Sequence, residues 1–507
     1  MKIKRIALSA MIASACISGS AFGQTSRNAA PRYAPASYYS YYDEATPSAG
    51  KVASAATNKL SSEVVQASAT NCDNGKACDN TGASNNGNGC DATGRGTCDS
   101  AGGLGSALGG ALGGRLGRGC DTAGSGAAGC DIGSGAAGGC DSMCGSSGLF
   151  GMGILGTGRS LSDPWKLFSK PVAGFNIGGW TSVGYHSYSN PFSFNTYPKR
   201  LQLGQQWFYA EKVADGSNGL GLGGRVDYLY GTDAPDTQTF GIANNHWDNG
   251  WDNGGQYGHA LPQAYGEVAY GDLSVKVGHF FTIVGNEVVA ATGNFFYSRQ
   301  FTFYNAEPFT HTGALSTYKV SDDTQLFNGY VMGWDSGFED NGDAYIGGIK
   351  TKVSDRWTFL WNSVLGRFGE AKSFNANERG GIQNVMLIGS LTDKLTYISQ
   401  TDYLYTQNES GITARNSFGN INYLIYQLND RWALGQRFEW FNYSGSGFGG
   451  AQNDELYNFT TGVNYRAHAN LLFRPEVRWV WDKSRYGFNE DNAGSQAAIG
   501  GDVVFTF

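Results

Sequence analysis

Charged side chains recur at every second position in two stretches near the end of the chain. One stretch holds Arg437 and Glu439, and the other holds Arg474, Glu476 and Arg478, with mostly apolar residues between them. Alternate residues of an extended strand lie on the same face, so each stretch would separate its charges from its apolar residues. Charges of both signs that line a lumen would order water and bias the passage of ions. Alternatively, they would only neutralise one another in a wide lumen.

The elements that would carry these charges are long strands. Aromatic residues reach 14%, charged residues only 16%, and Gly numbers 76, a composition that favours strands and turns over helices. Most predicted strands run for about 10 to 15 residues, the length that a tilted strand needs to cross a bilayer. Sixteen strands are predicted, at 173–187, 199–213, 220–232, 260–270, 273–284, 308–320, 324–335, 343–353, 357–366, 381–391, 395–406, 415–428, 431–443, 455–466, 470–482 and 495–507.

The connections between these strands alternate in length. Short ones carry Asp or Asn, as in "YGD" at 270–272 and "SDD" at 321–323, and these residues favour tight turns. Longer connections lie between them, including 233–259, 285–307, 367–380 and 444–454. Short turns on one side and long loops on the other are typical of an outer-membrane β-barrel. An even strand number puts both ends of the barrel on the periplasmic side.

Three hairpins allow a test of register, because a slip of one residue exchanges the two faces of a strand. Two-residue turns are predicted at Gly271-Asp272 and Asn429-Asp430, and a three-residue turn at 467–469. In the first hairpin the opposed pairs are then Tyr270 and Leu273, Val268 and Val275, and Glu267 and Lys276. In the second they are Ile425 and Leu434, Ile421 and Phe438, Asn422 and Arg437, and Asn420 and Glu439. In the third they are Val463 and Phe473, Phe459 and Val477, and Tyr457 and Trp479. Each hairpin has one apolar and one polar face.

A soluble antiparallel sandwich would alternate in the same way. The length and number of the strands favour the membrane barrel instead. So do Trp440, Tyr443, Trp479 and Trp481, which are predicted at strand ends on the loop side, where membrane barrels carry an aromatic girdle.

The polar face supplies the candidate pore-lining residues. Besides the five charges named first, they are Arg225, Asp227, Glu267 and Lys276. The aromatic segment 284–307 is expected to fold inward and narrow the pore, with Glu287, Arg299 and Glu307 near the constriction. The alternative is that this segment packs over the mouth of the barrel.

The chain ends in an alternating strand, "IGGDVVFTF", in which Ile499, Gly501, Val503, Phe505 and Phe507 share one face. A barrel in lipid leaves no open sheet edge, so the last strand is expected to pair with the first. The pattern resembles the carboxy-terminal signal read by the barrel-insertion machinery, with Phe505 and Phe507 as its aromatic residues.

Three stretches resemble the OmpL-like family of beta-barrel porins. They are "LSDPWKLF" at 161–168, "GGWTSVGY" at 178–185 and the segment "VGHFFTIVGNEVVAATGNFFYSRQFTFYNAEPFTHTGALSTYKV" at 277–320. The resemblance covers about 161–507. It implies a channel in the outer membrane and leaves the solute open.

Acidic loops raise the question of a bound cation. The tandem "WDNGWDNG" at 247–254 and the segment "DSGFEDNGD" at 335–343 offer oxygen ligands that suit calcium. In the second segment the ligands would be Asp335, Glu339, Asp340 and Asp343. The same letters are also ordinary turn residues, which is the preferred interpretation, and no cofactor is required.

The chain begins like a secreted protein. Lys2, Lys4 and Arg5 precede a short apolar stretch, and cleavage is predicted before Gln24; lipid attachment at Cys16 is the alternative. Residues 24–70 are a low-complexity segment rich in Ser, Ala and Tyr. Residues 71–160 form a Gly-rich extension that is predicted to be disordered and periplasmic, and residues 161–507 form the barrel.

The extension carries eight cysteines, at Cys72, Cys78, Cys90, Cys98, Cys120, Cys130, Cys140 and Cys144. The cell envelope is oxidising, so disulfides within the chain or to envelope partners are the leading hypothesis. Binding of a soft metal and an inert linker are the alternatives. Eight cysteines allow 105 pairings, and the sequence does not choose among them.

The composition excludes some functions and favours one. The formal charge is −7 without basic blocks, which argues against nucleic acid as a partner. No histidine has metal spacing and no nucleophile motif is present, so no enzyme is predicted.

The sequence predicts an all-β membrane barrel that passes small hydrophilic solutes. The runner-up is a structural or adhesive barrel with a closed lumen. Lipid and the insertion machinery are expected partners, and nothing decides whether the chain forms a homotrimer.

Overall fold

The computed structural model describes residues 161, 164–190, 193–243, 245–253, 255–339, 342–371, 374–448, 450–485 and 488–507. The predicted signal peptide, the low-complexity segment, Cys16 and the eight cysteines of the extension lie outside these residues.

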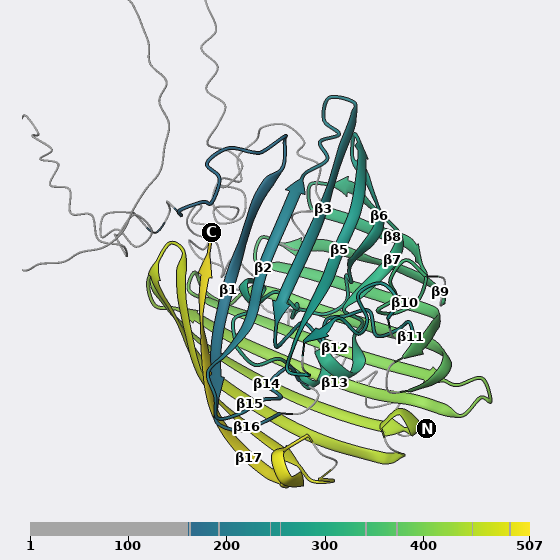
Figure 1. Ribbon diagram of the computed structural model, residues 1–507, viewed down its shortest axis with the longest axis vertical. Helices are drawn as coiled ribbons and strands as arrows, with labels where there is room; N and C mark the ends of the chain where they lie inside the picture. The colour runs from purple at the N-terminus through teal and green to yellow at the C-terminus, as the bar shows by residue number, and fades with distance from the viewer. Residues whose placement is uncertain are drawn as a thin grey trace, which may run out of the picture. The chain divides into compact units, whose positions relative to one another are not determined.

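The described part of the chain is almost entirely strand (Figure 1). The elements are β1 (Asn176–His186), β2 (Gln202–Lys212), β3 (Leu220–Gly231), β4 (Asp252–Asn253), β5 (Tyr257–Tyr270), β6 (Leu273–Phe281), η1 (Ala291–Gly293), α3 (Phe301–Ala306), β7 (Thr310–Ser321), β8 (Thr324–Val331), β9 (Asp343–Ser354), β10 (Trp357–Ala371), β11 (Phe374–Ser390), β12 (Leu395–Gln407), β13 (Thr413–Gln427), β14 (Trp432–Gly445), η2 (Ser446–Phe448), β15 (Ala451–His468), β16 (Leu471–Asp482), η3 (Glu490–Asn492) and β17 (Ser495–Thr506). Among the described residues, no helix has the length and apolar character needed to cross a membrane.

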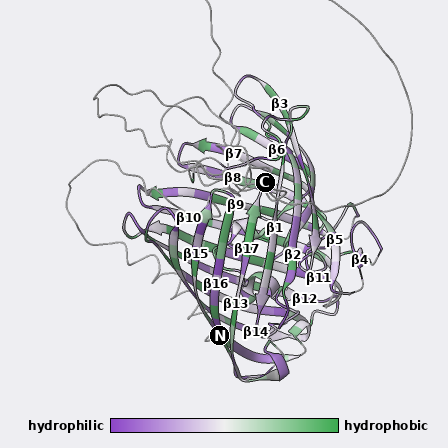
Figure 2. Ribbon diagram, turned by 60° about the vertical axis from the view of Figure 1, so that its left-hand side comes forward, coloured by the Kyte–Doolittle hydropathy of each residue, from purple (hydrophilic) through white to green (hydrophobic). Residues whose placement is uncertain are grey.

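The strands form a closed antiparallel barrel. Each pairs with its neighbour in the chain, β3 pairs with β5, and β1 pairs with β17, which closes the ring. Within the described residues the ring has sixteen strands, and the two-residue β4 is added beside β5. All sixteen predicted strands are present. Figure 2 shows hydrophobic and hydrophilic residues interspersed along them, as the alternation of faces requires.

The first predicted register is correct, and the second is wrong by one residue. Glu267 lies opposite Lys276, as expected from a turn at Gly271-Asp272. In the second hairpin the Asn429 side chain accepts the N–H groups of Arg431 (2.9 Å) and Trp432 (3.1 Å), so the turn contains three residues instead of two.

This slip of one residue turns the side chains of β13 to the faces opposite those predicted. The observed pairs are Ile425 with Gly435 and Asn422 with Phe438. Ile421 and Ile425 are therefore buried inside the barrel, while Asn420 and Asn422 share the outer face with exposed Phe438.

The third predicted register is displaced by two residues. An even displacement leaves each side chain on its predicted face of the strand. Phe459 lies opposite Trp479 instead of Val477, because Ala469 and Asn470 form the turn and a bulge follows Arg466.

The assignment of Tyr443 to the aromatic girdle is wrong: Tyr443 faces inward and is fully buried. It lies three positions from Trp440, and an odd spacing puts two strand residues on opposite faces.

Two predicted loops are largely strand. β10 continues to Ala371 and β11 begins at Phe374, with Arg367 still paired to Arg379. β15 likewise begins at Ala451. The backbone hydrogen bonds of these hairpins continue past the apolar band that set the predicted ends.

Part of the barrel interior is packed. Inward-facing Val364, Ile382 and Leu404 form one apolar cluster with Ile283 and Phe301, which belong to the long connection between β6 and β7. That connection, residues 282–309, is called the inner loop below, and the path of the teal chain after β6 can be followed in Figure 1.

Candidate functional site

The inner loop contains η1 and α3 and lies against the inward-facing side chains of the barrel. It carries many aromatic residues, and Phe295, Phe296 and Phe303 are buried. Gly285 has a φ of +87°, and a Cβ atom there would lie 1.8 Å from the Glu307 carboxylate. The loop therefore needs glycine at the point where the chain turns inward.

Two carboxylates of the barrel wall accept backbone N–H groups of the inner loop. Glu476 on β16 accepts those of Tyr297 (2.8 Å) and Ser298 (3.1 Å). Glu439 on β14 accepts those of Phe301 (3.1 Å) and Thr302 (2.7 Å), together with the Thr302 hydroxyl (2.8 Å). The N–H groups of Phe301 and Thr302 have no partner within α3, because the first turn of a helix leaves its donors unsatisfied.

Three arginines of the same wall hold carbonyls and rings of the inner loop. Arg474 donates to the carbonyls of Ala291 (2.7 Å) and Asn294 (2.6 Å), and forms an ion pair with Asp502. The Arg478 guanidinium lies 4.4 Å from the centre of the Phe301 ring.

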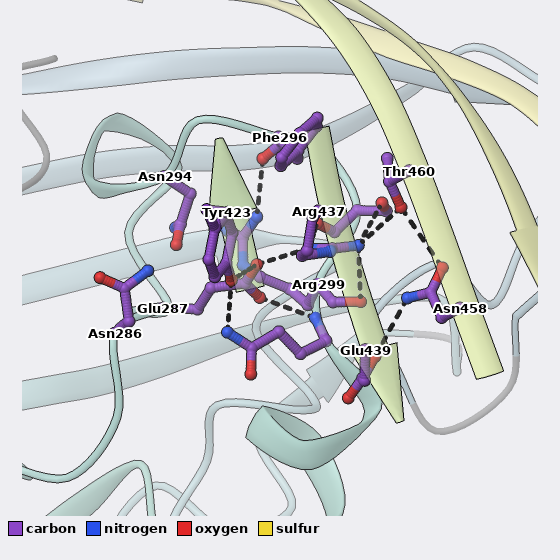
Figure 3. A network of polar contacts seen from close by, with 12 residues as sticks. Asn286, Glu287, Asn294, Phe296, Arg299, Tyr423, Arg437, Glu439, Asn458 and Thr460 are labelled. Atoms are coloured by element: carbon purple, nitrogen blue, oxygen red, sulfur yellow. Dashed lines mark hydrogen bonds and ion pairs between the residues drawn. The ribbon is translucent and has the colours of Figure 1, made fainter. Parts of the chain in front are cut away.

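Figure 3 shows Arg437 between the loop and β15. It donates to the Ser298 carbonyl (2.9 Å) and to the Thr460 hydroxyl (3.1 Å), and pairs with Glu287. We call the set Arg437, Glu439, Arg474, Glu476 and Arg478 the anchoring wall.

The three charged residues predicted for the constriction are all buried in the inner loop. Glu287 accepts the N–H of Gln300 (2.7 Å) and the hydroxyl of Tyr423 (2.9 Å). Arg299 donates to the Val289 carbonyl (2.9 Å) inside the loop. Glu307 accepts from the Gln400 amide (2.7 Å).

The pKa of the Glu307 carboxyl is raised well above its usual range. Burial is the main cause, and the nearby Asp402 charge adds to it. A raised pKa favours the protonated form of Glu307. Its role at a constriction stays a prediction.

The remaining predicted pore-lining charges lie on β3, β5 and β6 and pair with strand neighbours. Arg225 forms ion pairs with Asp227 (2.8 Å) and with Glu211 of β2 (3.3 Å). Glu267 lies opposite Lys276, whose ammonium is 4.7 Å from the Tyr265 ring centre. We call the set Arg225, Asp227, Glu267, Lys276 and Glu211 the paired wall. All nine predicted pore-lining residues thus occupy inward-facing positions, and pore lining itself stays a prediction.

Several residues that hold the inner loop were not given this role by the sequence analysis. Gln205 on β2 accepts the Ala291 N–H (2.8 Å) and donates to the Val289 carbonyl (2.7 Å). Asn362 on β10 donates to the Ile283 carbonyl (2.7 Å), and Asp335 accepts the N–H of Phe309 (2.8 Å). Uncharged amides within alternating strands gave no signal. Asp502 could have been found, because it alternates with the apolar face of the last strand.

A comparison with protein families identifies the barrel. Residues 174–507 match the family described as "Putative beta-barrel porin-2, OmpL-like". The chain belongs to this family. It is an outer-membrane porin, and a porin family indicates a channel rather than an enzyme. No curated protein matches the chain significantly.

Two solved structures have a similar chain path. A loop L8 deletion mutant of OmpT from Vibrio cholerae has 11% identity and a TM-score of 0.47, covering 66% of this chain and 99% of its own. An anion-selective porin from Comamonas acidovorans has 9% identity and a TM-score of 0.48, covering 66% of this chain and 99% of its own. At these values the matches carry no information on solute or assembly.

The closure of the porin barrel uses the end of the chain. The Phe507 carbonyl accepts the N–H of Gly179 (3.0 Å), and the Phe507 N–H donates to the carbonyl of Gly179 (2.9 Å). Phe505 pairs with Thr181 and lies on the outer face, beside Trp165 at 6.3 Å between ring centres. Recognition of Phe505 and Phe507 by the insertion machinery stays a prediction.

The acidic loop residues of the porin have separate partners. Asp335 is buried against backbone N–H groups, Glu339 pairs with His246 (2.6 Å), and Asp343 pairs with Arg367 (2.8 Å). Asp340 lies outside the described residues. In the part of the chain that the structure describes, no three acidic, His or Cys residues form a metal cluster.

Proposed function

We propose that this porin passes small hydrophilic solutes and ions by passive diffusion, and that the inner loop sets the width of the path. The observation that carries the proposal is the inner loop itself, which lies inside a closed barrel and is held there by inward-facing charges. A loop held against the wall narrows a lumen that sixteen strands would otherwise leave wide.

The path follows the paired wall. The anchoring wall is covered by the inner loop, and Arg437 and Glu439 are 0% exposed. On the paired wall, the Arg225 and Glu211 side chains keep 10% and 16% of their surface exposed, and Lys276 is half-buried. Solutes would therefore meet charges of both signs from Glu211, Arg225 and Lys276 on β2, β3 and β6, whereas Asp227 and Glu267 are buried.

The mixed signs on both walls support weak ion preference. Opposite charges placed across a narrow path create a transverse field, which orients water without excluding either sign of ion. A strongly selective filter would instead present one sign.

Planar-bilayer conductance of the purified full-length protein tests the proposal. We expect stable single-channel steps with weak ion preference, and larger steps after deletion of residues 288–303. Deletion of residues 409–411, in the exposed connection between β12 and β13, is the control and should leave the steps unchanged.

Two results would contradict the proposal. A folded, heat-modifiable barrel without conductance would favour the structural barrel with a closed lumen. Steps of unchanged size after deletion of 288–303 would remove the inner loop as the element that sets the width.

A further inference from the structure

The segment before β1, residues 164–175, lies across the seam at which β1 pairs with β17. Val172 and Phe175 exchange two backbone hydrogen bonds (2.8 and 2.9 Å) and form a tight turn directly before β1. Upstream of this turn, Trp165 contacts the end of β17 and the turn between β15 and β16, and Figure 1 shows this part of the chain in dark blue beside the C-terminus. We call residues 164–175 the seam segment.

The seam differs from the other strand pairs of the ring. Among the strands that the structure describes, β1 and β17 are the first and the last, so no turn joins them. At its periplasmic end the ladder of the seam stops at Gly179 and Phe507. Strand ends that no turn holds together open most readily in a folded protein. This end of the seam therefore depends on contacts from outside the ladder.

The side chain of Asn470 supplies one such contact. Asn470 lies in the turn between β15 and β16 and is only 3% exposed. Its amide oxygen accepts the N–H of Trp165 (2.6 Å), and its amide nitrogen donates to the carbonyl of Trp165 (2.8 Å). The same nitrogen donates to the carbonyl of Thr506 (2.8 Å), whose N–H donates to the Asn470 carbonyl (3.0 Å). One buried amide thus ties the seam segment to the end of β17.

Aromatic rings cover the outer face of β17 at the same end. The rings of Trp165 and Phe505 stack with their centres 6.3 Å apart and an angle of 24° between their planes. Phe507 follows at 6.4 Å from Phe505, and it lies 5.6 Å from Phe208 of β2. Phe505 is partly buried in this row, whereas Ile499, on the same face of the same strand, is 65% exposed.

We propose that the seam segment is a latch: it holds β1 against β17 in the closed ring, and it covers the face of Phe505 that the insertion machinery would otherwise contact. Trp165 is joined to β1 by a short tether, so its bonds to Asn470 form as an intramolecular contact once β1 lies beside β17. One face of the Phe505 ring cannot hold Trp165 and a second protein together. The latch therefore closes as the machinery leaves β17, and the two exclude each other. The proposal does not depend on the proposed channel function.

Hydrogen exchange of the purified full-length protein in lipid nanodiscs tests the latch. Asn470→Ala removes the amide that joins Trp165 to Thr506. We expect the backbone amides of 176–181 and 503–507 to exchange roughly ten-fold faster in this variant, because it loses hydrogen bonds that cross the seam. The amides of β12 and β13 should exchange at the native rate.

Asn408→Ala is the matched control. Asn408 also accepts a backbone N–H, that of Ile412 (3.0 Å), but it does so in the connection between β12 and β13, so exchange at the seam should stay native. Trp165→Ala is a second test variant that keeps Asn470 and its turn, and it should still raise exchange at 503–507 a few-fold. A seam that is unchanged in both test variants, or faster exchange throughout the barrel, would overturn the latch.

Photo-crosslinking in growing cells tests the exclusion between the latch and the insertion machinery. The full-length chain would carry p-benzoylphenylalanine in place of Val503, which shares the outer face of β17 with Phe505. After a pulse of labelled amino acids, adducts with the machinery should vanish during the chase. They should last several-fold longer when Asn470→Ala is added, and no longer than in the native chain when Asn408→Ala is added.

Equal adduct lifetimes in all three chains would overturn the exclusion. Single-channel conductance should stay unchanged in every variant, because Trp165 and Phe505 meet on the outer face of the barrel. A failure of the latch would therefore be distinguishable from a failure of the channel.

Discussion

The anchoring wall and the paired wall are made from the same residue types in the same alternation, yet their charges are bound differently. On β14 and β16 each carboxylate and arginine bonds a segment that is more than a hundred residues away in the chain. On β3, β5 and β6 the charges pair with residues of the same or the next strand. The difference lies in what packs on each wall.

This difference separates two tasks within one lumen. The anchoring wall would fix the shape of the proposed path, because its charges satisfy the backbone of a loop that contains little regular structure. Arg225 and Glu211 of the paired wall keep part of their surface exposed, so under the proposed function this wall would act on the ions that pass. A change on the first wall should alter stability and conductance together, whereas a change on the second should alter ion preference alone.

Arg474→Met should have the largest effect. It leaves the Asp502 carboxylate buried without its cation, and the carbonyls of Ala291 and Asn294 without their donor. Removal of one partner of a buried pair costs about 3–5 kcal/mol. We expect a lower temperature of conversion to the unfolded form on unboiled gels, and noisier conductance. Lys276→Met on the paired wall is the control, and an equal loss of stability there would abolish the distinction between the walls.

Glu439→Gln should weaken the same contact less. The amide keeps one acceptor oxygen for Phe301 and Thr302 but loses the charge, and hydrogen bonds to charged groups contribute about 1.5–3 kcal/mol. Single-channel records should show more frequent transitions between levels, as the start of α3 detaches from the wall. Glu211→Gln provides the comparison on the paired wall. Records that are equally quiet in both variants would contradict an anchoring role for Glu439.

The far end of the inner loop should make stability depend on pH. Asp335 accepts the N–H groups of Phe309 and Thr310, and burial raises the pKa of its carboxyl to about 7 in spite of these bonds. The folded state therefore holds a proton that the unfolded state, with an ordinary pKa near 3.8, has already lost. The contribution of Asp335 to the free energy of unfolding is greatest below the unfolded pKa and falls as the pH rises through about 7. Between pH 6 and 8 the fall is about 1.4 kcal/mol.

Urea titrations of the folded protein at pH 6 and pH 8 would measure this dependence. Asp335→Asn keeps an acceptor oxygen without a titrating proton, so its fall in stability from pH 6 to pH 8 should be smaller than that of the native chain by about 1.4 kcal/mol. If the native chain is equally stable at pH 6 and pH 8, Asp335 does not carry the proton.

The strand pattern was accessible from sequence because alternation and turn residues are local signals. All sixteen strands and the closure of β17 on β1 follow from them. The register at 271–272 was also correct, because Gly271 and Asp272 form the whole turn. At 429–431 the Asn429 side chain recruits Arg431 into the turn, and a count of turn residues does not reveal that bond. The resulting slip of one residue placed Asn420 and Asn422 on the outer face of the barrel.

The candidate site was accessible only in part. Alternation placed Arg437, Glu439 and Glu476 on the inner face, but it did not indicate that they would bond the inner loop. That outcome depends on contacts between segments far apart in the chain, such as Glu476 with Ser298. Gln205 and Asn362 were missed because an uncharged amide in a strand looks the same whether it faces water, a loop or another side chain.

The smallest expected effect is on ion preference, and it belongs to the paired wall. Glu267→Gln removes a negative charge opposite Lys276, so the reversal potential in a salt gradient should shift toward anion preference. Lys276→Gln should shift it the other way by a similar amount. Both shifts should be clear at low salt, where the Debye length is about 30 Å at 0.01 M, and nearly absent at 1 M, where it is about 3 Å. Opposite shifts with unchanged conductance steps would separate the two walls most clearly, because the anchoring wall offers no charge that can be changed without moving the loop. Shifts of the same sign would mean that both substitutions act through the structure, and the paired wall would then be a second anchoring surface.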